Sequence, residues 1–319
     1  MSHRAIELAG DSPAVGRARA LLQRAAALET GVLLVAERGV DVEAVARELH
    51  CLGRGQAEPL IAITCADDAA ALDRALFGTP GVNPSTDLVA VTSDSRIGSA
   101  RGGTLFLQDV AELPSAVQAR LARVARDGEI SLDGQPVPTK CRIVASASPD
   151  IERDVREHRF RPDLFRRIAA SRIDLPPLRD RSEDIPVLIA RLVEQGRQHD
   201  GPVRRFTDAA LAVMSALSWG GNLAELRSVV DRVLCETTAT VIQIEDVLPS
   251  LQLDRSMTAF FPAGSLKEAR LRFERDYIAA VLQYHGWKVA DAAQTLGIQR
   301  PNLYRKARQL GIPVNRIGD

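Results

Sequence analysis

The chain of 319 residues has little lysine, few aromatic residues, few cysteines and no net charge. No lysine occurs before Lys140, and only 4% of the residues are aromatic. The 41 basic residues balance the 41 acidic ones, so that net charge indicates neither a nucleic-acid nor a membrane partner. A hydrophobic content of 45% is typical of a soluble globular protein, and the length predicts two or three domains.

The four cysteines are scattered, and none of them forms a C-x-x-C pair. They are Cys51, Cys65, Cys141 and Cys235. Their spacing favours buried thiols in a reducing compartment over a disulfide framework or a zinc site, and we expect no metal. The sequence has no apolar run of membrane-spanning length, and a helix signal begins almost at the first residue. We therefore expect a cytoplasmic protein without a membrane partner.

Short apolar segments alternate with helical patterns in the first half of the chain. Strands are predicted at 32–35, 59–65, 104–107, 142–147 and 172–175, and helices at 13–28, 68–76 and 114–126. Ser12 before Pro13 is a typical N-cap for the first of these helices. The alternation predicts an α/β fold, a parallel sheet flanked by helices. Residues 78–99 are rich in Gly, Pro, Asn and Ser and predict an irregular surface insertion.

The pattern changes after Pro176 and Pro177, beyond which we expect no strand. Residues 183–234 are helical in pattern, 253–264 have the composition of a linker, and 265–312 are again helical. These changes divide the chain into an α/β subdomain at 1–178, a helical subdomain at 179–252, a linker at 253–264 and a C-terminal domain at 265–319.

A loop around Gly39 joins the first strand to a helix in the segment GVLLVAERGVDVEAVAREL, residues 31–49. This is the layout of a P-loop, whose backbone N–H groups wrap phosphates and whose lysine neutralises them. Here Asp41 adds negative charge where a polyanion would lie, and Val42 occupies the lysine position. The alternative interpretation is an ordinary turn between a strand and a helix, with no ligand.

Four further stretches keep a consistent order and spacing: GGTLFLQDVAELP (102–114), FRPDLFRRI (160–168), LPPLRDRSEDIPVL (175–188) and WGGNLAEL (219–226). Together with the loop they resemble the AAA+ domain of bacterial sigma-54-dependent enhancer-binding activators. The resemblance implies an AAA+ sheet in residues 1–178 and an α-helical lid subdomain in residues 179–252.

The resemblance assigns nucleotide-binding positions to residues that mostly depart from the family pattern. Glu37 and Gly39 match, whereas the remaining positions of the loop do not; they are Ala36, Arg38, Val40, Asp41 and Val42. The metal-binding Asp is Gln108, and the water-activating Glu is Asp109. The sensor Asn is Ser148, and the lid arginine is Ala224.

Two arginine positions that act on a neighbouring subunit's nucleotide are kept, as Arg161 and Arg167, although ordinary surface arginines are the alternative. Phosphoryl transfer depends almost entirely on positioning and charge neutralisation. We therefore predict a pseudo-ATPase with no catalytic residue and no cofactor, and no residue selects a particular nucleotide for the cleft. The insertion that begins LFGTPG at Leu76 also lacks the G-A-F-T-G-A motif with which the family contacts sigma-54.

The C-terminal part carries a helix-turn-helix pattern. Val289, Ala292, Ala293 and Leu296 share one helix face, Gly297 supplies the turn, and a second helix begins near residue 300. The segment VADAAQTLGIQRPNLYRKARQLGI resembles the Fis-type DNA-binding domain that ends many of these activators. Arg and Asn suit base edges, whereas Lys and Tyr suit phosphates. The predicted DNA-binding residues are Gln299, Arg300, Asn302, Tyr304, Arg305 and Lys306. The alternative is a solvated basic helix face.

An apolar stripe precedes this motif, formed by Leu266, Phe273, Tyr277, Ala280 and Tyr284. In Fis-type domains such helices pair two protomers, although an intramolecular core has the same periodicity. We predict a homodimer on an inverted repeat of double-stranded DNA, with RNA polymerase as a further partner.

The resulting hypothesis is a sequence-specific transcription regulator with a degenerate, non-hydrolysing AAA+ domain. Two alternatives stay open. One is an ATP-dependent sigma-54 activator, and the other is an inhibitory partner in mixed oligomers with active homologues.

Overall fold

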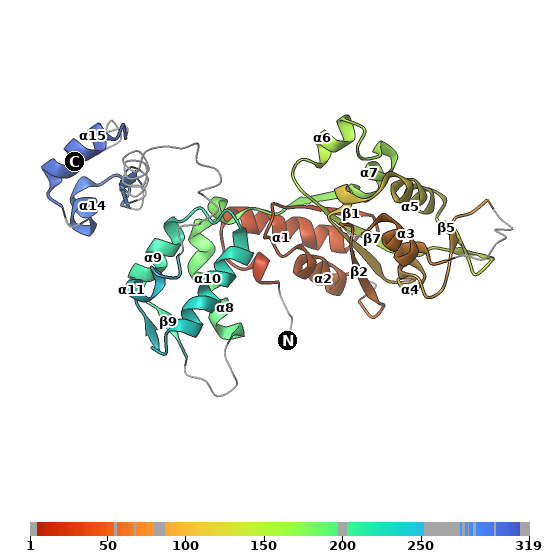
Figure 1. Cartoon of the computed structure of the whole chain (residues 1–319), viewed down its shortest axis with the longest axis horizontal. Helices are drawn as coiled ribbons and strands as arrows, with labels where there is room; N and C mark the ends of the chain where they lie inside the picture. The colour runs from red at the N-terminus through yellow and green to blue at the C-terminus, as the bar shows by residue number, and fades with distance from the viewer. Residues whose placement is uncertain are drawn as a thin grey trace. The chain divides into compact units, whose positions relative to one another are not determined.

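The computed structural model describes residues 5–53, 56–66, 68–79, 87–196, 203–251, 285–296 and 298–312, together with 275, 278, 279, 281 and 282. The chain forms two compact units, Met1–Ser250 and Leu251–Asp319 (Figure 1). Each unit is described by itself. Within the described residues, no helix has the length and hydrophobicity of a membrane-spanning segment.

The first unit is built on a five-stranded parallel sheet with the order β2-β4-β7-β1-β8. The strands are β1 (Val32–Val35), β2 (Leu60–Thr64), β4 (Thr104–Gln108), β7 (Arg142–Ala147) and β8 (Ser171–Asp174). The predicted parallel sheet is confirmed. Because all five strands run the same way, their carboxyl ends lie at one edge, where the loop after β1 and the residue after β4 are found.

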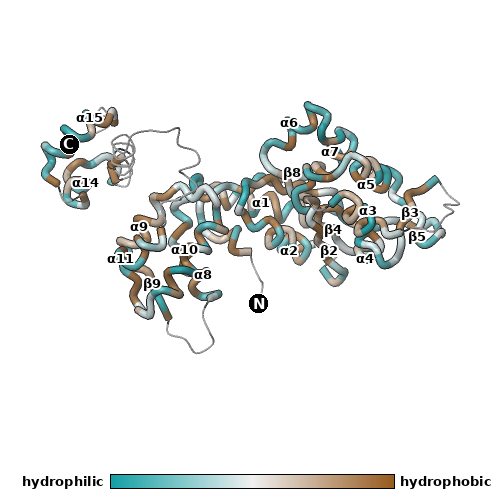
Figure 2. Tube along the Cα trace, viewed as in Figure 1, coloured by the Kyte–Doolittle hydropathy of each residue, from teal (hydrophilic) through white to brown (hydrophobic). Residues whose placement is uncertain are grey.

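Helices cover both faces of this sheet (Figure 1). They include α1 (Pro13–Ala26), α2 (Val42–Leu52), α3 (Ala69–Phe77), α5 (Ser115–Asp127), α6 (Ile151–Arg156) and α7 (Pro162–Ile168). Successive strand residues point to opposite faces. Leu34 and Phe106 therefore join a core with α1 and α2, whereas Leu33 and Leu105 join a second core with α3 and α5. Brown segments along the sheet and the adjoining helices mark these cores (Figure 2).

The helix starts follow their capping residues. The Ser12 hydroxyl accepts a hydrogen bond from the Val15 N–H and caps α1, as the sequence predicts. Asp68 caps α3 in the same way through the Ala70 and Ala71 N–H groups.

The prediction that residues 78–99 form an irregular surface insertion is wrong for the second half of this segment. That half contains β3 (Ala90–Val91) and α4 (Arg96–Ser99), and Val91 and Ile97 are buried. The strand β3 pairs with β5 (Glu129–Leu132), which forms a hairpin with β6 (Gln135–Pro138). Local composition indicated a loop because the partner strand lies about forty residues later in the chain.

The remainder of the first unit is mainly helical. It contains α8 (Ile185–Gln195), α9 (Asp208–Ala216), α10 (Asn222–Glu236) and α11 (Ile244–Val247), preceded by the 3₁₀ turns η3 (Leu178–Asp180) and η4 (Ser182–Asp184). A parallel pair of two-residue strands, β9 (Arg205–Phe206) and β10 (Val241–Ile242), corrects our expectation that no strand follows Pro177. Strands this short have no readable periodicity.

In the second unit, α14 (Val289–Thr295) and α15 (Arg300–Gln309) pack around Ala292, Leu303 and Ala307, which are fully buried or nearly so. The predicted pair of short helices is therefore present. The stripe Leu266, Phe273, Tyr277, Ala280 and Tyr284, the predicted linker at 253–264 and the turn residue Gly297 lie outside the described residues.

Candidate functional site

The loop between β1 and α2 lies at the carboxyl edge of the sheet, where open α/β folds bind ligands. The Ala36 N–H extends the sheet by donating to the Ala147 carbonyl at 3.0 Å. Gly39 has φ +85°, and a Cβ at this position would lie 2.0 Å from the Gly221 carbonyl oxygen. The close approach of Gly221 is therefore enough to require glycine at position 39, whether or not a phosphate binds.

Carboxylates of the chain itself occupy the start of α2. The Asp41 carboxylate caps the helix by accepting from the Ala44 N–H at 3.0 Å. The Asp41 N–H in turn donates to the Glu7 carboxylate at 3.2 Å. A helix N-terminus attracts anions because its N–H groups and dipole carry partial positive charge. Here the carboxylates of Asp41 and Glu7 already accept hydrogen bonds from N–H groups at this helix start. Val42, the next residue, is buried in the apolar core.

Glu7 is held by a second buried charge, Arg181, and both side chains are completely inaccessible to solvent. Arg181 donates to the Glu7 carboxylate and to the Glu7 carbonyl oxygen. Burial raises the pKa of Glu7, and Arg181 opposes that rise. This pair could not be expected from the sequence. Arg181 lies in a stretch that is distinguished only by its resemblance to the family, and Glu7 lies in no motif.

Glu37 forms a two-pronged ion pair with Arg179, at 2.6 and 2.5 Å. The hydrogen bonds from Arg179 lower the pKa of Glu37. The carboxylate of this matching loop residue is thus engaged by an arginine that sequence reasoning missed.

The start of α10 is hydrogen-bonded directly to the loop. The Asn222 amide donates to the Arg38 carbonyl at 2.9 Å and accepts from the Leu178 N–H at 2.9 Å. The Ala224 N–H donates to the Gly39 carbonyl at 3.0 Å. At position 224 the lid therefore contacts the loop through its backbone, and an alanine side chain offers no charge to a phosphate.

At the end of β4, Gln108 and Asp109 lie at the same edge of the sheet. The Gln108 carbonyl accepts from the Cys65 N–H, and the Asp109 N–H donates to the Ser146 hydroxyl at 3.0 Å. Asp109 has left-handed backbone angles, φ 56° and ψ 54°. In the described part of the chain, no group of three His, Cys, Asp or Glu side chains is arranged to hold a metal ion.

Arg161 is the N-cap of α7 and Arg167 lies in its last turn, and both are exposed. Arg161 pairs with Asp163 at 2.8 and 3.0 Å, which raises the pKa of the arginine. Arg167 donates to the Ala125 carbonyl at 2.9 Å. Both arginines are engaged within their own chain, but exposed ion pairs such as that of Arg161 are weak and exchange readily.

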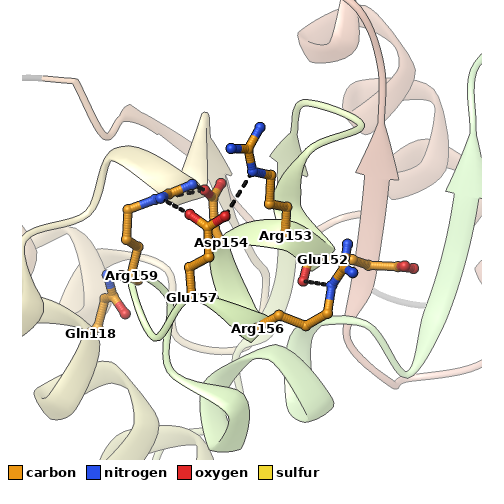
Figure 3. Close-up of polar contacts among 7 residues, drawn as sticks. All are labelled: Gln118, Glu152, Arg153, Asp154, Arg156, Glu157 and Arg159. Carbon is orange, nitrogen blue, oxygen red and sulfur yellow. Dashed lines mark hydrogen bonds and ion pairs between the residues drawn. The ribbon is translucent and has the colours of Figure 1, made fainter.

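Beside them, α6 carries a network of alternating charges (Figure 3). Arg153 donates to Glu157, Arg159 to Asp154, and Arg156 to the Glu152 carbonyl. These exposed pairs fix the side chains of one surface rather than forming a cleft.

The six predicted DNA-binding residues lie on α15 or at its N-cap. Gln299 is the N-cap, and Arg300, Asn302, Tyr304 and Arg305 are exposed, whereas Lys306 is half-buried. The Arg305 guanidinium donates to the Asn302 side chain at 3.2 Å. The helix thus presents arginine, asparagine and tyrosine side chains on the surface opposite its buried Leu303 and Ala307.

The turn before α14 contains two residues with left-handed backbone angles. Gly286 and Trp287 both have positive φ, 57° and 66°. Glycine adopts this conformation freely, whereas tryptophan does so at a cost. Trp287 also packs against the core of the unit, and this contact offsets part of the cost.

Three protein-family models match consecutive parts of the chain. Residues 8–174 match the sigma-54 interaction domain, 179–259 the AAA+ ATPase lid domain, and 270–310 the Fis family of bacterial regulatory proteins. The chain is 32% identical to the DNA-binding transcriptional regulator NtrC of Azospirillum brasilense, over 98% of this chain and 71% of NtrC. It is 31% identical to the nitric oxide reductase transcription regulator NorR2 of Cupriavidus necator, over 96% of this chain and 63% of NorR2.

Among solved structures, NtrX from Brucella abortus in complex with ATP is similar, with a TM-score of 0.74 and 28% identity over 95% of this chain and 69% of NtrX. The fold and its helix-turn-helix therefore define an AAA+ protein of the transcription-regulator class. The chain belongs to the family of DNA-binding, sigma-54-dependent transcriptional regulators.

Proposed function

We propose that this chain is a sequence-specific DNA-binding regulator whose AAA+ domain does not hydrolyse ATP. The observation that carries the proposal is the start of α2, where Asp41 and Glu7 carboxylates accept the hydrogen bonds of the helix and Val42 is the first helical residue. A triphosphate at this place would meet two carboxylates and no lysine.

The remaining positions support the same conclusion. Gln108 offers a neutral amide where the family binds metal with a carboxylate, and amides are weaker ligands for Mg²⁺. Ala224 offers a methyl group where the family neutralises phosphate. Catalysis of phosphoryl transfer relies on these charges, because the protein contributes little covalent chemistry of its own.

Steady-state phosphate release from ATP tests this proposal. We expect the full chain to release no more phosphate than a boiled sample. ATP-dependent release that Asp109→Asn abolishes would establish an active ATPase and favour the alternative, an ATP-dependent sigma-54 activator. Asp109→Asn is the matched control because it separates release by this site from release by a contaminant.

We further propose that the chain does not remodel sigma-54 polymerase. The insertion that follows Phe77 lacks the G-A-F-T-G-A motif, and residues 80–86 lie outside the described part. Open-complex formation by sigma-54 holoenzyme is the measurement, and formation that requires both this chain and ATP would contradict the proposal.

The C-terminal domain is proposed to bind an inverted repeat as a dimer, in the cytoplasm where bacterial DNA lies. Two-fold symmetric recognition helices read half-sites about one DNA turn, roughly 34 Å, apart. Binding curves and footprints of the full chain on a selected site test the proposal, and a strictly monomeric footprint would contradict it.

A second candidate function is that of an inhibitory partner in mixed oligomers. The observation that favours it is the exposure of Arg161 and Arg167, which leaves both guanidinium groups accessible to a neighbour. Phosphate release by an active homologue, measured with increasing amounts of this chain, tests it. Inhibition that Arg161→Ala and Arg167→Ala change supports a mixed ring, whereas unchanged release excludes it.

A further inference from the structure

A cavity of about 420 Å³ opens at the amino-terminal edge of the five-stranded sheet. Residues at the starts of β4 and β7, Thr104 and Arg142, line it and are register partners in the sheet. Ala26 at the end of α1, Leu28 just after it and His50 near the end of α2 line another part of the wall. The loop after β1 lies at the opposite, carboxyl edge, so that this cavity is separate from the AAA+ nucleotide site. Its volume falls in the range of about 300–1,000 Å³ that is typical of small-molecule sites.

Two cationic side chains line the cavity. Lys140 is the only lysine in residues 1–250 and is exposed. Its backbone is fixed, because the Lys140 carbonyl accepts from the Gly102 N–H at 2.9 Å. Arg142 is half-buried and donates from Nε to Thr30 and from Nη2 to Ala25, both through carbonyl oxygens.

The second terminal nitrogen of Arg142, Nη1, has no hydrogen bond within the described residues. It lies beside Gly53, where a Cβ would be 3.4 Å away. Burial also lowers the pKa of Arg142, because the surrounding protein replaces water around its charge, and the negative charge of Glu29 opposes that lowering only in part. An anion beside Nη1 would compensate that charge.

The rest of the wall is rigid and partly apolar. Both ring nitrogens of His50 are hydrogen-bonded: Nε2 donates to the Glu58 carbonyl at 3.0 Å, and Nδ1 lies 2.9 Å from the Thr104 hydroxyl oxygen. Leu28 lines the cavity although 51% of its surface is exposed. Glu29 also lines the cavity and offsets one of the two cations, so that the lining side chains carry one net positive charge. The exposed Glu58 carboxylate lies nearby, beside Gly102.

We propose that this cavity binds a small organic anion, with its acidic group between Lys140 and Arg142 and its apolar part against Leu28. The site is independent of the AAA+ nucleotide cleft and gives the regulator a place for a small-molecule signal. A neutral ligand would leave the two cationic side chains unpaired. An inorganic anion would leave the apolar side chain of Leu28 without a contact.

The scarcity of lysine makes a direct test feasible. Reductive ¹³C-methylation of the full chain labels its four lysines, Lys140, Lys267, Lys288 and Lys306, and keeps their charge. The Lys140 signal is assigned with Lys140→Arg, and phenyl phosphate is the probe. We expect a saturable shift of the Lys140 signal alone. No saturation at about 10 mM phenyl phosphate, well above the roughly 1 mM Kd of a weak ligand, overturns the proposal.

Calorimetric titrations of unmethylated protein complete the test. Lys140→Met removes an exposed side chain and preserves the fold, and it should weaken phenyl phosphate binding at least about tenfold. Gly53→Ala keeps every charge but places a methyl group beside Arg142 Nη1, and it should weaken binding as well. Arg166→Met, an exposed arginine of the same unit, is the control and should leave the affinity unchanged. The proposal is contradicted if benzyl alcohol or inorganic phosphate binds with the same affinity as phenyl phosphate.

Discussion

Asp41 changes the charge that the N-terminus of α2 presents. As the N-cap it accepts a hydrogen bond that a phosphate would otherwise accept, and it stabilises the helix while repelling an anion. The same side chain thus stabilises the helix and, under the proposed function, lowers its affinity for a phosphate. Val42 then removes the cation that could have compensated this charge.

We expect Asp41→Ala to lower the free energy of unfolding by about 0.5–2 kcal/mol, because a helix N-cap is lost. ATP binding should stay absent, since Val42 still supplies no positive charge. Urea unfolding and titration with a fluorescent ATP analogue measure the two effects. Asp68→Ala, which removes the cap of α3, is the matched control and should show a similar loss of stability. Measurable ATP affinity in Asp41→Ala alone would show that the carboxylate is the sole obstacle.

The buried ion pair of Glu7 and Arg181 connects the first residues of the fold to the segment that follows β8. Arg181→Met leaves the Glu7 carboxylate buried without a partner, and we expect a loss of about 3–5 kcal/mol in unfolding free energy at pH 7. Arg179→Met breaks an exposed pair with Glu37 and should cost only about 0–1 kcal/mol. Denaturant unfolding of both variants measures the difference, and equal losses would contradict the assignment.

The loss in Arg181→Met should depend on pH. The folded-state pKa of Glu7 is raised above its ordinary 4.5, so the fold favours the protonated carboxyl. The contribution of the protonated Glu7 carboxyl to the free energy of unfolding is fully present below pH 4.5, and it is lost as pH rises through the folded-state pKa. Without Arg181 the folded pKa rises further, and the deficit of the variant should shrink as pH falls toward 4.5. A deficit that grows on acidification would be inconsistent with this account.

At the scale of elements, we expect different side chains of α15 to specify sequence and to add affinity. Arg300 and Asn302 lie in its first turn, and replacing either with Ala should cost about 1–3 kcal/mol at one base position. Lys306→Ala should weaken binding to all sequences and lower the salt slope by about one unit. Gel-shift titrations on the selected site and on single-base variants measure both effects. Binding unaffected by all three substitutions would exclude α15 as the recognition helix.

The elements also show what the sequence could predict. Four of the five strands of the parallel sheet, β1, β2, β4 and β7, were predictable because each is a short, mainly apolar run. The fifth, β8, reads Ser-Arg-Ile-Asp and gives a weaker signal, because Ile173 is its one apolar residue. The hairpin of β5 and β6 was missed although Asp133 and Gly134 form a turn with φ 49° and 89°, a sequence typical of two-residue hairpin loops. The pairing of β3 with β5 had no local signal, because it depends on residues distant in the sequence.

The candidate site was predictable in its positions but not in its contacts. Family resemblance located the loop after β1 and the residues that depart from the pattern. Glu7 and Arg179 contact the loop from distant parts of the chain, and Arg181 in turn holds Glu7. No spacing rule connects these residues to the loop. Charged partners brought together only by the tertiary fold require the structure.

At the scale of the whole molecule, a nucleotide that bound the AAA+ domain would stabilise it. A ligand present at 100 times its Kd adds about 2.7 kcal/mol to the free energy of unfolding. We therefore expect the thermal midpoint of the full chain to stay unchanged in millimolar Mg-ATP. NtrX of Brucella abortus, whose crystal structure contains ATP, is the positive control under the same conditions. A rise in midpoint that Arg38→Ala or Asp109→Asn removes would place ATP in the cleft and contradict the interpretation of a self-capped loop. A rise that Lys140→Met removes would instead place the nucleotide's phosphates in the cavity at the opposite edge of the sheet. The two outcomes differ because each variant changes only one end of the parallel strands.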